Sequence, residues 1–198
     1  MGEKRQARQG ADVLLQEEPL RFQTRKQVGL LGGNFNPVHL AHLVMADQVQ
    51  NQLGLDKVYL MPTYLPPHVD EKKTISSEHR LAMLELAVAD NPCLDIEPIE
   101  LIRKGKSYTY DTMKALKEAN PDTDYYFIIG GDMVEYLPKW HRIDDLLHLV
   151  QFVGIRRPNY PTESTYPIIW VDVPQMAISS TLIRQKVKSG CSTRYLLP

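Results

Sequence analysis

The fold is decided at residues 27–42, which read QVGLLGGNFNPVHLAH. The apolar run at 28–31 stops at two glycines, as a buried strand does where it enters a loop. A helical pattern follows, because apolar residues recur at every fourth position across 41–53 and Gly54 supplies a C-terminal stop. A strand, a glycine loop and a helix in this order predict an α/β domain that begins at this strand.

The same alternation continues toward the end of the chain. Strand-like apolar runs and helical stretches follow each other without the tight turns of β-hairpins. The expected strands lie at 58–61, 94–96, 125–129, 152–155 and 168–171, and the expected helices start at Ser77, Thr109 and Ser179. This order predicts a parallel sheet with helices on both faces. Ligands of such sheets bind beyond the carboxyl ends of the strands, so the segments after the strands are candidates for a site.

Composition and charge narrow the class of protein. The 198 residues suffice for one domain at 27–198, preceded by a polar, aperiodic extension at 1–26 that we expect to be flexible. A net charge of -1 argues against a nucleic-acid partner. No apolar run approaches the roughly 20 residues of a membrane span, and no secretory signal is recognised. Two distant cysteines, Cys93 and Cys191, fit a reducing compartment, so we expect a cytoplasmic protein with no membrane partner.

The loop after the first strand has the residues of a phosphate site. Gly32 and Gly33 let the backbone approach a ligand, and the following helix directs free N–H groups and its positive dipole end at the loop. His39 and His42 are three positions apart, so both lie on one face of that helix. Imidazole donors at this place can hold phosphate oxygens and stabilise charge that builds on a phosphoryl group.

The same loop allows plainer interpretations. Two glycines can form an ordinary turn, and two histidines can simply lie at a helix start. The loop is not a Walker A loop, because no Gly-Lys-Ser/Thr follows, and its spacing differs from the dinucleotide fingerprint. A zinc pair is a further option, but no third ligand is evident nearby, so we expect no resident metal site.

A second anion-binding signature lies near the end of the chain, in Ile178-Ser179-Ser180-Thr181-Leu182-Ile183-Arg184. Hydroxyls and free N–H groups at a helix start can cradle phosphate, and Arg184 lies one turn further on. Alone, such a segment is more often plain capping with a surface arginine. Two helix starts that converge on one crevice can hold a polyphosphate.

Together, Gly-Gly-x-Phe-x-Pro-x-His-x-x-His from Gly32 and Ile-Ser-Ser-Thr-x-Ile-Arg from Ile178 resemble the motifs of the nucleotidylyltransferase superfamily. The closer similarity is to bacterial nicotinate-nucleotide adenylyltransferases, and it covers the chain from about Gln27 onward. The resemblance implies a Rossmann-like α/β fold and transfer of the adenylyl group of ATP to nicotinic acid mononucleotide. The products are deamido-NAD and pyrophosphate, with Mg²⁺ as the cofactor that accompanies ATP and no covalent enzyme intermediate.

The resemblance also assigns residues to ATP. His39 and His42 contact its phosphates, and His42 is placed to stabilise the transition state. We expect these two histidines and Arg184 to be the catalytic residues. The resemblance further implies that ATP is bound by Gly32, Gly33, Asn34, Phe35, Ser179 and Ser180.

On the mononucleotide side, the resemblance implies that Trp140 stacks on the pyridine ring, while Thr109 and the backbone N–H of His141 bind the nicotinate carboxylate. Asp132 binds ribose hydroxyls or orients the metal, and Arg157 grips the phosphate of the mononucleotide. Plainer roles are open to three of these residues. Trp140 can be a packing residue, Asp132 a helix N-cap and Arg157 part of a solvated basic turn.

Three other functions compete with this one. A nicotinamide-mononucleotide, pantetheine-phosphate or cytidylyl transferase has the same framework, although Trp140 and Ser107-Tyr108-Thr109 favour a pyridine substrate. A non-catalytic nucleotide sensor has no need of groups that act on the α-phosphate. A hydrolase built on the histidines needs a tightly held transition metal. A homodimer is compatible with each of these functions.

Overall fold

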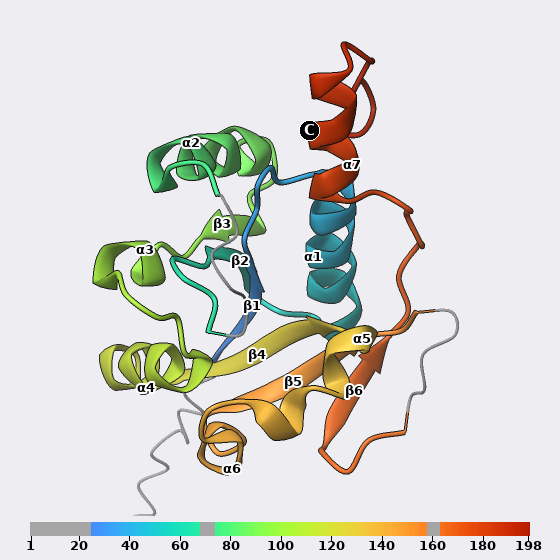
Figure 1. The fold of residues 1–198 in the computed structure, drawn as a ribbon. Coiled ribbons are helices and arrows are strands. Elements are labelled where there is room, and N and C mark those ends of the chain that lie inside the picture. Colours follow the sequence, from blue (N-terminus) through green and yellow to red (C-terminus); the bar gives the residue numbers. More distant parts are fainter. Residues whose placement is uncertain (1–24, 68–73, 158–162) are drawn as a thin grey trace, which may run out of the picture.

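Six parallel strands form one sheet in the part of the chain that the structure describes (Figure 1). The structure is a computed structural model and describes residues 25–67, 74–157 and 163–198. The strands are β1 Lys26–Gly33, β2 Lys57–Pro62, β3 Leu94–Ile96, β4 Thr123–Gly130, β5 Val150–Ile155 and β6 Ile168–Val171. Their order is β3-β2-β1-β4-β5-β6, which reverses between β1 and β4. The carboxyl ends of these two strands therefore flank the point where such sheets bind ligands.

Helices cover both faces of the sheet, as the sequence predicts. They are α1 Leu40–Leu53, α2 Ser77–Val88, α3 Ile99–Arg103, α4 Thr109–Ala119, α5 Gly131–Val134, the 3-10 helix η1 Leu137–Lys139, α6 Ile143–Leu146 and α7 Ser180–Lys188. Helix α1 ends as expected at Gly54, whose φ of 62° lies in the left-handed region that favours glycine. The predicted Rossmann-like α/β architecture is confirmed.

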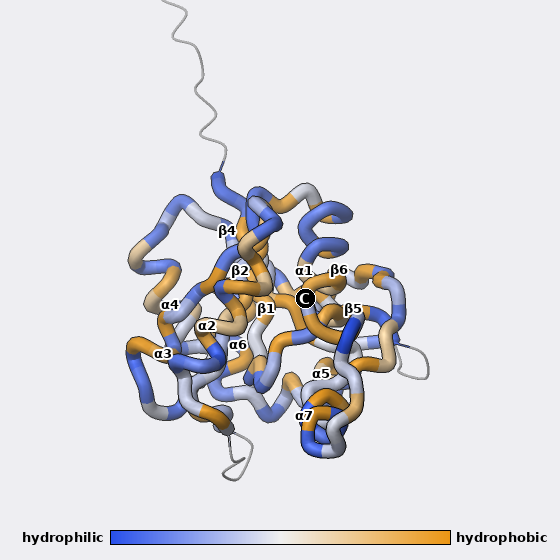
Figure 2. The backbone as a smooth tube through the Cα atoms, turned by 90° about the horizontal axis from the view of Figure 1, so that it is seen from above, coloured by the Kyte–Doolittle hydropathy of each residue, from blue (hydrophilic) through white to orange (hydrophobic). Residues whose placement is uncertain are grey.

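The alternation of side chains along each strand divides the core into two clusters. On β1, Leu30 joins the cluster shared with α4 and α6, while its neighbour Leu31 joins the cluster shared with α1 and α2. On β4, Phe127 and Ile128 divide in the same way. In Figure 2 the hydrophobic colours gather toward the middle of the molecule, where these strands lie. The rigid centre fixes the strand ends that carry the site.

The structure differs from the sequence prediction at the chain start and in the short helices. Strand β1 begins at Lys26, inside the predicted extension at 1–26, and Arg25 pairs with Asp124 at 2.9 Å. Residues 1–24, for which flexibility was predicted, lie outside the described residues. Helices α3, α5, η1 and α6 were not predicted, because elements of three to five residues are too short to show a period. Within the described ranges, the structure contains no helix that is both long and apolar enough to cross a membrane.

Candidate active site

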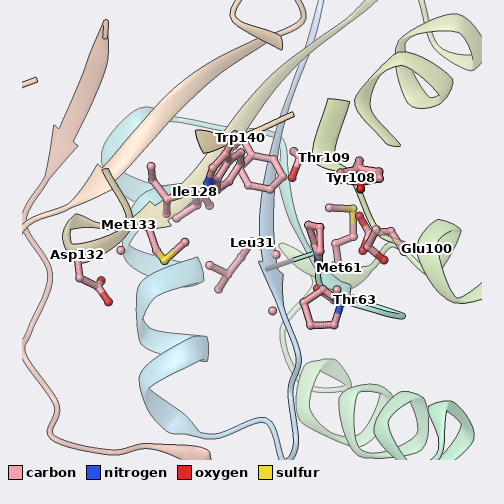
Figure 3. Close-up of a pocket in the computed structure, with 18 of the residues that line it drawn as sticks. Leu31, Met61, Thr63, Glu100, Tyr108, Thr109, Ile128, Asp132, Met133 and Trp140 are labelled. Atoms are coloured by element: carbon pink, nitrogen blue, oxygen red, sulfur yellow. The ribbon is translucent and has the colours of Figure 1, made fainter. Parts of the chain in front are cut away.

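Two neighbouring cavities lie beyond the carboxyl ends of the strands, one at the ends of β1 and β4 and the other at the end of β5. The first has a volume of about 390 Å³ and lies between the ends of β1 and β4 and the start of α4 (Figure 3). The second, of about 600 Å³, lies between the start of α1 and the segment that leads into α7. His42, Met45 and Arg157 line both cavities, so the cavities meet at these side chains.

The loop after β1 is shaped by its own side chains. The Phe35 ring is 2% exposed, and it packs so closely that a Cβ atom on Gly33 would lie 2.9 Å from it. Packing therefore requires a glycine at this position, in addition to ligand access. The Asn34 side chain is also engaged, because its Oδ1 accepts a hydrogen bond from Arg80 at 3.3 Å. Gly32 and Gly33 line the first cavity, whereas the side chains of Asn34 and Phe35 shape the loop.

Arg80 organises this loop, although the sequence gives no sign of that role. It lies on α2, is 2% exposed, and its Nη1 donates to the carbonyl oxygens of Asn34 at 2.9 Å and Thr63 at 2.7 Å. One guanidinium thus ties the loop after β1 to the end of β2. Burial lowers the pKa of Arg80, and no carboxylate within the described ranges pairs with it. Main-chain acceptors leave no signal in a sequence pattern, which explains why this structural role of Arg80 was not predicted.

His39 and His42 stack on each other at the start of α1. Their ring centroids are 3.7 Å apart and the ring planes differ by 24°. The backbone N–H of His39 donates a hydrogen bond to Nδ1 of His42 at 3.2 Å. Burial lowers the pKa of His39 to about 4. Burial, together with repulsion from His39, lowers the pKa of His42 to about 3.

This hydrogen bond determines which nitrogen of His42 carries the proton. Because Nδ1 accepts a hydrogen bond, it holds a free lone pair, and the proton of the neutral ring resides on Nε2. The low pKa keeps the ring neutral at pH 7. His42 therefore offers an N–H donor without a full positive charge, at the place where the two cavities meet.

Helix α7 reaches the site by docking on the loop that precedes α1 (Figure 1). Ser180 Oγ donates to the carbonyl of Pro37 at 2.8 Å, and Arg184 Nη1 donates to the carbonyl of Asn36. Ser179 is the N-cap of α7 and lines the second cavity. The two predicted helix starts thus come together. Ser180 and Arg184 line neither cavity in this conformation, so their contact with ATP stays a prediction.

Trp140 forms one wall of the first cavity (Figure 3). It follows η1, and its ring meets those of Phe127 and Phe152 edge to face, with centroids 5.8 Å and 5.9 Å away. Trp140 is therefore both a packing residue and a cavity residue. Its indole Nε1 is buried and has no hydrogen-bond partner among the described residues.

Thr109 and His141 lie beside this wall. Thr109 is the first residue of α4, where the backbone N–H groups have no partner within the helix. The His141 ring contacts that of Tyr108, with the centroids 4.7 Å apart. These three residues line the cavity together with Trp140, so the residues predicted for the pyridine side share one site.

Asp132 and Arg157 form an ion pair close to the junction of the cavities. The distance from Arg157 Nη1 to Asp132 Oδ1 is 3.5 Å, and Oδ1 is buried without a hydrogen bond from the described residues. A Cβ atom on Gly130 would lie 2.4 Å from this oxygen, so a larger residue here would displace the Asp132 carboxylate. Gly130 is also the N-cap of α5, which rules out the alternative of Asp132 as a plain N-cap.

Joined cavities at the switch point of a parallel sheet, with a helix start at each, are where proteins of this architecture bind nucleotides. The fold and the site thus define a nucleotide-binding α/β protein. Across the described ranges, no three histidine, cysteine, aspartate or glutamate side chains are grouped so as to hold a metal ion.

Comparison with known proteins gives this class a narrower definition. Residues 30–186 match the family described as cytidylyltransferase-like. Proteins of Streptococcus pneumoniae serotype 4 and Streptococcus mutans serotype c, both named "Probable nicotinate-nucleotide adenylyltransferase", are 63% identical to this chain over 182 residues. These matches cover 92% of this chain and 87% of each relative. The chain belongs to the cytidylyltransferase-like family and, within it, to the nicotinate-nucleotide adenylyltransferases.

Solved structures support the fold assignment. A nicotinic acid mononucleotide adenylyltransferase of Plasmodium falciparum, complexed with NaAD, superimposes with a TM-score of 0.70 at 18% identity, covering 85% of this chain and 87% of that one. A putative nicotinate-nucleotide adenylyltransferase of Vibrio parahaemolyticus gives a TM-score of 0.65 at 18% identity, covering 87% and 93%. The arrangement of strands and helices is therefore shared at low sequence identity.

Proposed function

We propose that this chain transfers the adenylyl group of ATP to nicotinic acid mononucleotide, forming deamido-NAD and pyrophosphate in NAD biosynthesis. The names of the streptococcal relatives support this reaction. The structural observation that carries it is the position of His42 at the junction of two cavities. A reaction that joins two nucleotides needs two adjoining sites with a donor where the phosphates meet.

The chemistry requires positioning more than covalent catalysis. A phosphate oxygen of the mononucleotide attacks the α-phosphorus of ATP, the bond from that phosphorus to the α–β bridging oxygen breaks, and pyrophosphate leaves. Negative charge on the transferring group is stabilised by donors that are already in place. His42 supplies Nε2–H at the junction, and its ring is held by the backbone N–H of His39.

We assign the second cavity, lined by His39 and Ser179, to ATP. Ser180 and Arg184 support this cavity from α7 by holding the loop before α1. The loop of Gly32, Gly33, Asn34 and Phe35 completes the ATP side. Because Gly32 and Gly33 line the first cavity, this loop also borders the mononucleotide.

We assign the first cavity to the mononucleotide. Trp140 stacks on the pyridine ring, and the free N–H groups at the start of α4, with the Thr109 hydroxyl and the backbone of His141, receive the carboxylate. Arg157 lines both cavities, so it can reach the mononucleotide phosphate beside Asp132.

Mg²⁺ fits this site as a companion of ATP. Mg²⁺ in nucleotide sites is commonly held by substrate phosphates plus one or two carboxylates. Oδ1 of Asp132, which accepts no hydrogen bond from the described residues although Arg157 lies 3.5 Å away, is a suitable carboxylate oxygen. When bound, the ion neutralises charge on the departing pyrophosphate.

We further place the reaction in the cytoplasm, with ATP and the mononucleotide as partners and no role for nucleic acid or membrane. The near-neutral net charge of -1 supports this, because a nucleic-acid partner favours a basic excess. A homodimer is compatible with this function.

The decisive experiment measures pyrophosphate release with ATP and Mg²⁺, using nicotinic acid mononucleotide and nicotinamide mononucleotide in parallel. We expect a strong preference for the acid. Equal use of both would indicate dual specificity. No release with either, but with retained binding of ATP, would contradict adenylyl transfer to a pyridine mononucleotide and favour other phosphate acceptors or a sensor. A hydrolase would lose activity when metal is stripped by a chelator and regain it with a transition metal.

A further inference from the structure

Glu100 is a buried carboxylate in the wall of the first cavity, at the end opposite Asp132 (Figure 3). It lies on α3 and is 3% exposed. Its burial raises its pKa, as expected for an acid removed from water. Neither the motifs of the sequence nor the adenylyl transfer described above uses this residue, so its presence in the cavity wall needs an explanation.

The partners of Glu100 lie on both sides of the start of α4. The Thr112 hydroxyl donates to Glu100 Oε1 at 2.9 Å, and Thr112 is fully buried. The Ser107 side chain also lies beside this carboxylate, where it lowers the pKa of Glu100 and partly offsets the effect of burial. Between these partners lie Tyr108, the N-cap of α4, and Thr109, its first residue. Glu100 therefore contacts the chain at Ser107, just before the helix start, and again at Thr112, within the first turns of α4.

Further hydrogen bonds hold Ser107 and Thr112, the two residues beside Glu100, in place. Ser107 Oγ accepts a hydrogen bond from the backbone N–H of Tyr64 at 3.1 Å, which ties the segment to the loop after β2. Arg103 Nη2 donates to Thr112 Oγ1 at 2.8 Å, and the Thr112 hydroxyl has two acceptors, Glu100 Oε1 at 2.9 Å and the Tyr108 carbonyl at 3.2 Å. Arg103 also lowers the electrostatic cost of the buried charge.

We propose that Glu100 is a positioning residue for the mononucleotide: through Ser107 and Thr112 it sets the start of α4, and thus places the free N–H groups of Thr109 and Tyr110 against the substituent of the pyridine ring. This inference rests on the proposed function, because it assumes that the first cavity takes the mononucleotide. Misplacement of donors by a fraction of an ångström weakens binding at a preorganised site. Loss of these contacts of Glu100 therefore acts on the mononucleotide and leaves the ATP cavity intact.

The test compares Glu100→Gln, Thr112→Val and the double variant. Glutamine keeps the size of the side chain but replaces one acceptor oxygen by a donor, and valine removes the hydroxyl without changing the shape. We expect each single variant to raise KM for nicotinic acid mononucleotide by about tenfold, the scale of one buried charge-assisted hydrogen bond. KM for ATP should stay within about twofold, because the ATP cavity does not include this segment. The double variant should be no worse than the singles, since both remove one shared contact.

Glu97→Gln is the matched control. Glu97 is a partly buried acid two residues before α3. Its pKa is likewise raised by burial, and its Oε1 accepts the backbone N–H of Ile99 at 3.0 Å. It does not line the cavity, so its substitution should change stability without changing either KM. Ser107→Ala removes the other side chain that lies beside Glu100. This variant is tested in place of Glu100→Gln or Thr112→Val if either fails to fold.

The outcomes separate the inference from the proposed function. An unchanged mononucleotide KM in Glu100→Gln and Thr112→Val, or an equal rise in both KM values, would overturn the positioning role while wild-type turnover still supports adenylyl transfer. A wild type that binds the mononucleotide in calorimetry without releasing pyrophosphate would contradict the function alone. In that case, the positioning role of Glu100 is tested by comparing the dissociation constants of the mononucleotide for the variants and the wild type. A wild type that binds no mononucleotide would overturn both.

Discussion

At the scale of single residues, the chemistry depends on the tautomer of His42. A backbone N–H donates to Nδ1, and burial keeps the ring neutral, so Nε2–H is a donor in a fixed orientation. Donors that are already oriented stabilise a transition state without the cost of reorganisation. His42→Ala should therefore lower kcat by about 100- to 1000-fold, the effect of removing one such donor, while ATP binding changes little. Steady-state kinetics and calorimetric binding of ATP measure the two effects.

His148→Ala is the control for this substitution, because His148 is exposed and lines neither cavity. Its kinetics should match those of the wild type. Equal losses of turnover and ATP affinity in His42→Ala would mean that His42 binds the ground state as strongly as the transition state.

The low pKa of His42 also predicts how stability depends on pH. The unfolded chain takes up a proton on this histidine near pH 6.5, whereas the folded chain does so only near pH 3. The unfolded state thus binds more protons between these values, and the free energy of unfolding falls as the pH is lowered through this window. From pH 7 to pH 5 the loss from this residue is at most about 2 kcal/mol.

Urea unfolding of the wild type and His42→Gln at pH 7 and pH 5 measures this contribution. Glutamine at this position keeps an acceptor for the backbone N–H of His39 but does not titrate. The variant should therefore lose less stability than the wild type on acidification. An identical loss in both proteins would show that His42 is not the group responsible.

At the scale of elements, the first cavity depends on a platform of aromatic rings. Trp140 rests edge to face on Phe127 and Phe152, which come from the two neighbouring strands β4 and β5. Stacking of a flat ring on such a side chain contributes about 1–3 kcal/mol by alanine substitution. Trp140→Ala should therefore raise KM for the mononucleotide by about tenfold or more, with KM for ATP nearly unchanged.

Phe152→Leu separates this effect from loss of packing. Phe152 is fully buried and does not line the cavity, so the variant should lower the melting temperature without a comparable rise in the mononucleotide KM. If Trp140→Ala instead raised KM for ATP, the pyridine ring would not stack on Trp140.

Elements with long patterns could be predicted from the sequence, and short ones could not. The helix expected to start at Thr109 matches α4, which begins at that residue and is long enough to show a helical period. Helix α3 has five residues and shows no period, so the buried Glu100 that it carries escaped notice. The motif loops could be interpreted because glycines and paired histidines occur together at a strand end, a combination that favours a phosphate site although each part alone has a structural explanation.

Residues that act through the main chain were also beyond prediction. Arg80 holds two carbonyl groups that any residue type could supply, so its sequence surroundings resemble those of an ordinary surface helix. Ser180 and Arg184 were predicted as ATP ligands. In the structure, both donate hydrogen bonds to carbonyl groups of the loop before α1. A motif can mark where a site lies without separating residues that touch the ligand from residues that hold the loop.

At the scale of the whole molecule, the two cavities act as one extended site because His42, Met45 and Arg157 belong to both. A dinucleotide that fills both cavities gains binding free energy from the contacts at each end. It loses translational freedom only once, whereas two separate nucleotides each lose it. Deamido-NAD should therefore bind more tightly than nicotinic acid mononucleotide alone, and it should raise the melting temperature more at equal concentration. Calorimetry and thermal shift measure the two quantities.

Variants at the two ends test whether one molecule spans both cavities. Trp140→Ala should weaken the mononucleotide and deamido-NAD but not ATP, while Ser179→Ala, at the second cavity, should weaken ATP and deamido-NAD but not the mononucleotide. Because the two residues belong to different cavities and share no partner, their penalties on deamido-NAD binding should add as free energies in the double variant. His148→Ala should change none of these constants. If deamido-NAD affinity responded to only one of the two substitutions, the dinucleotide would occupy a single cavity, and the joined-site geometry would have to be abandoned.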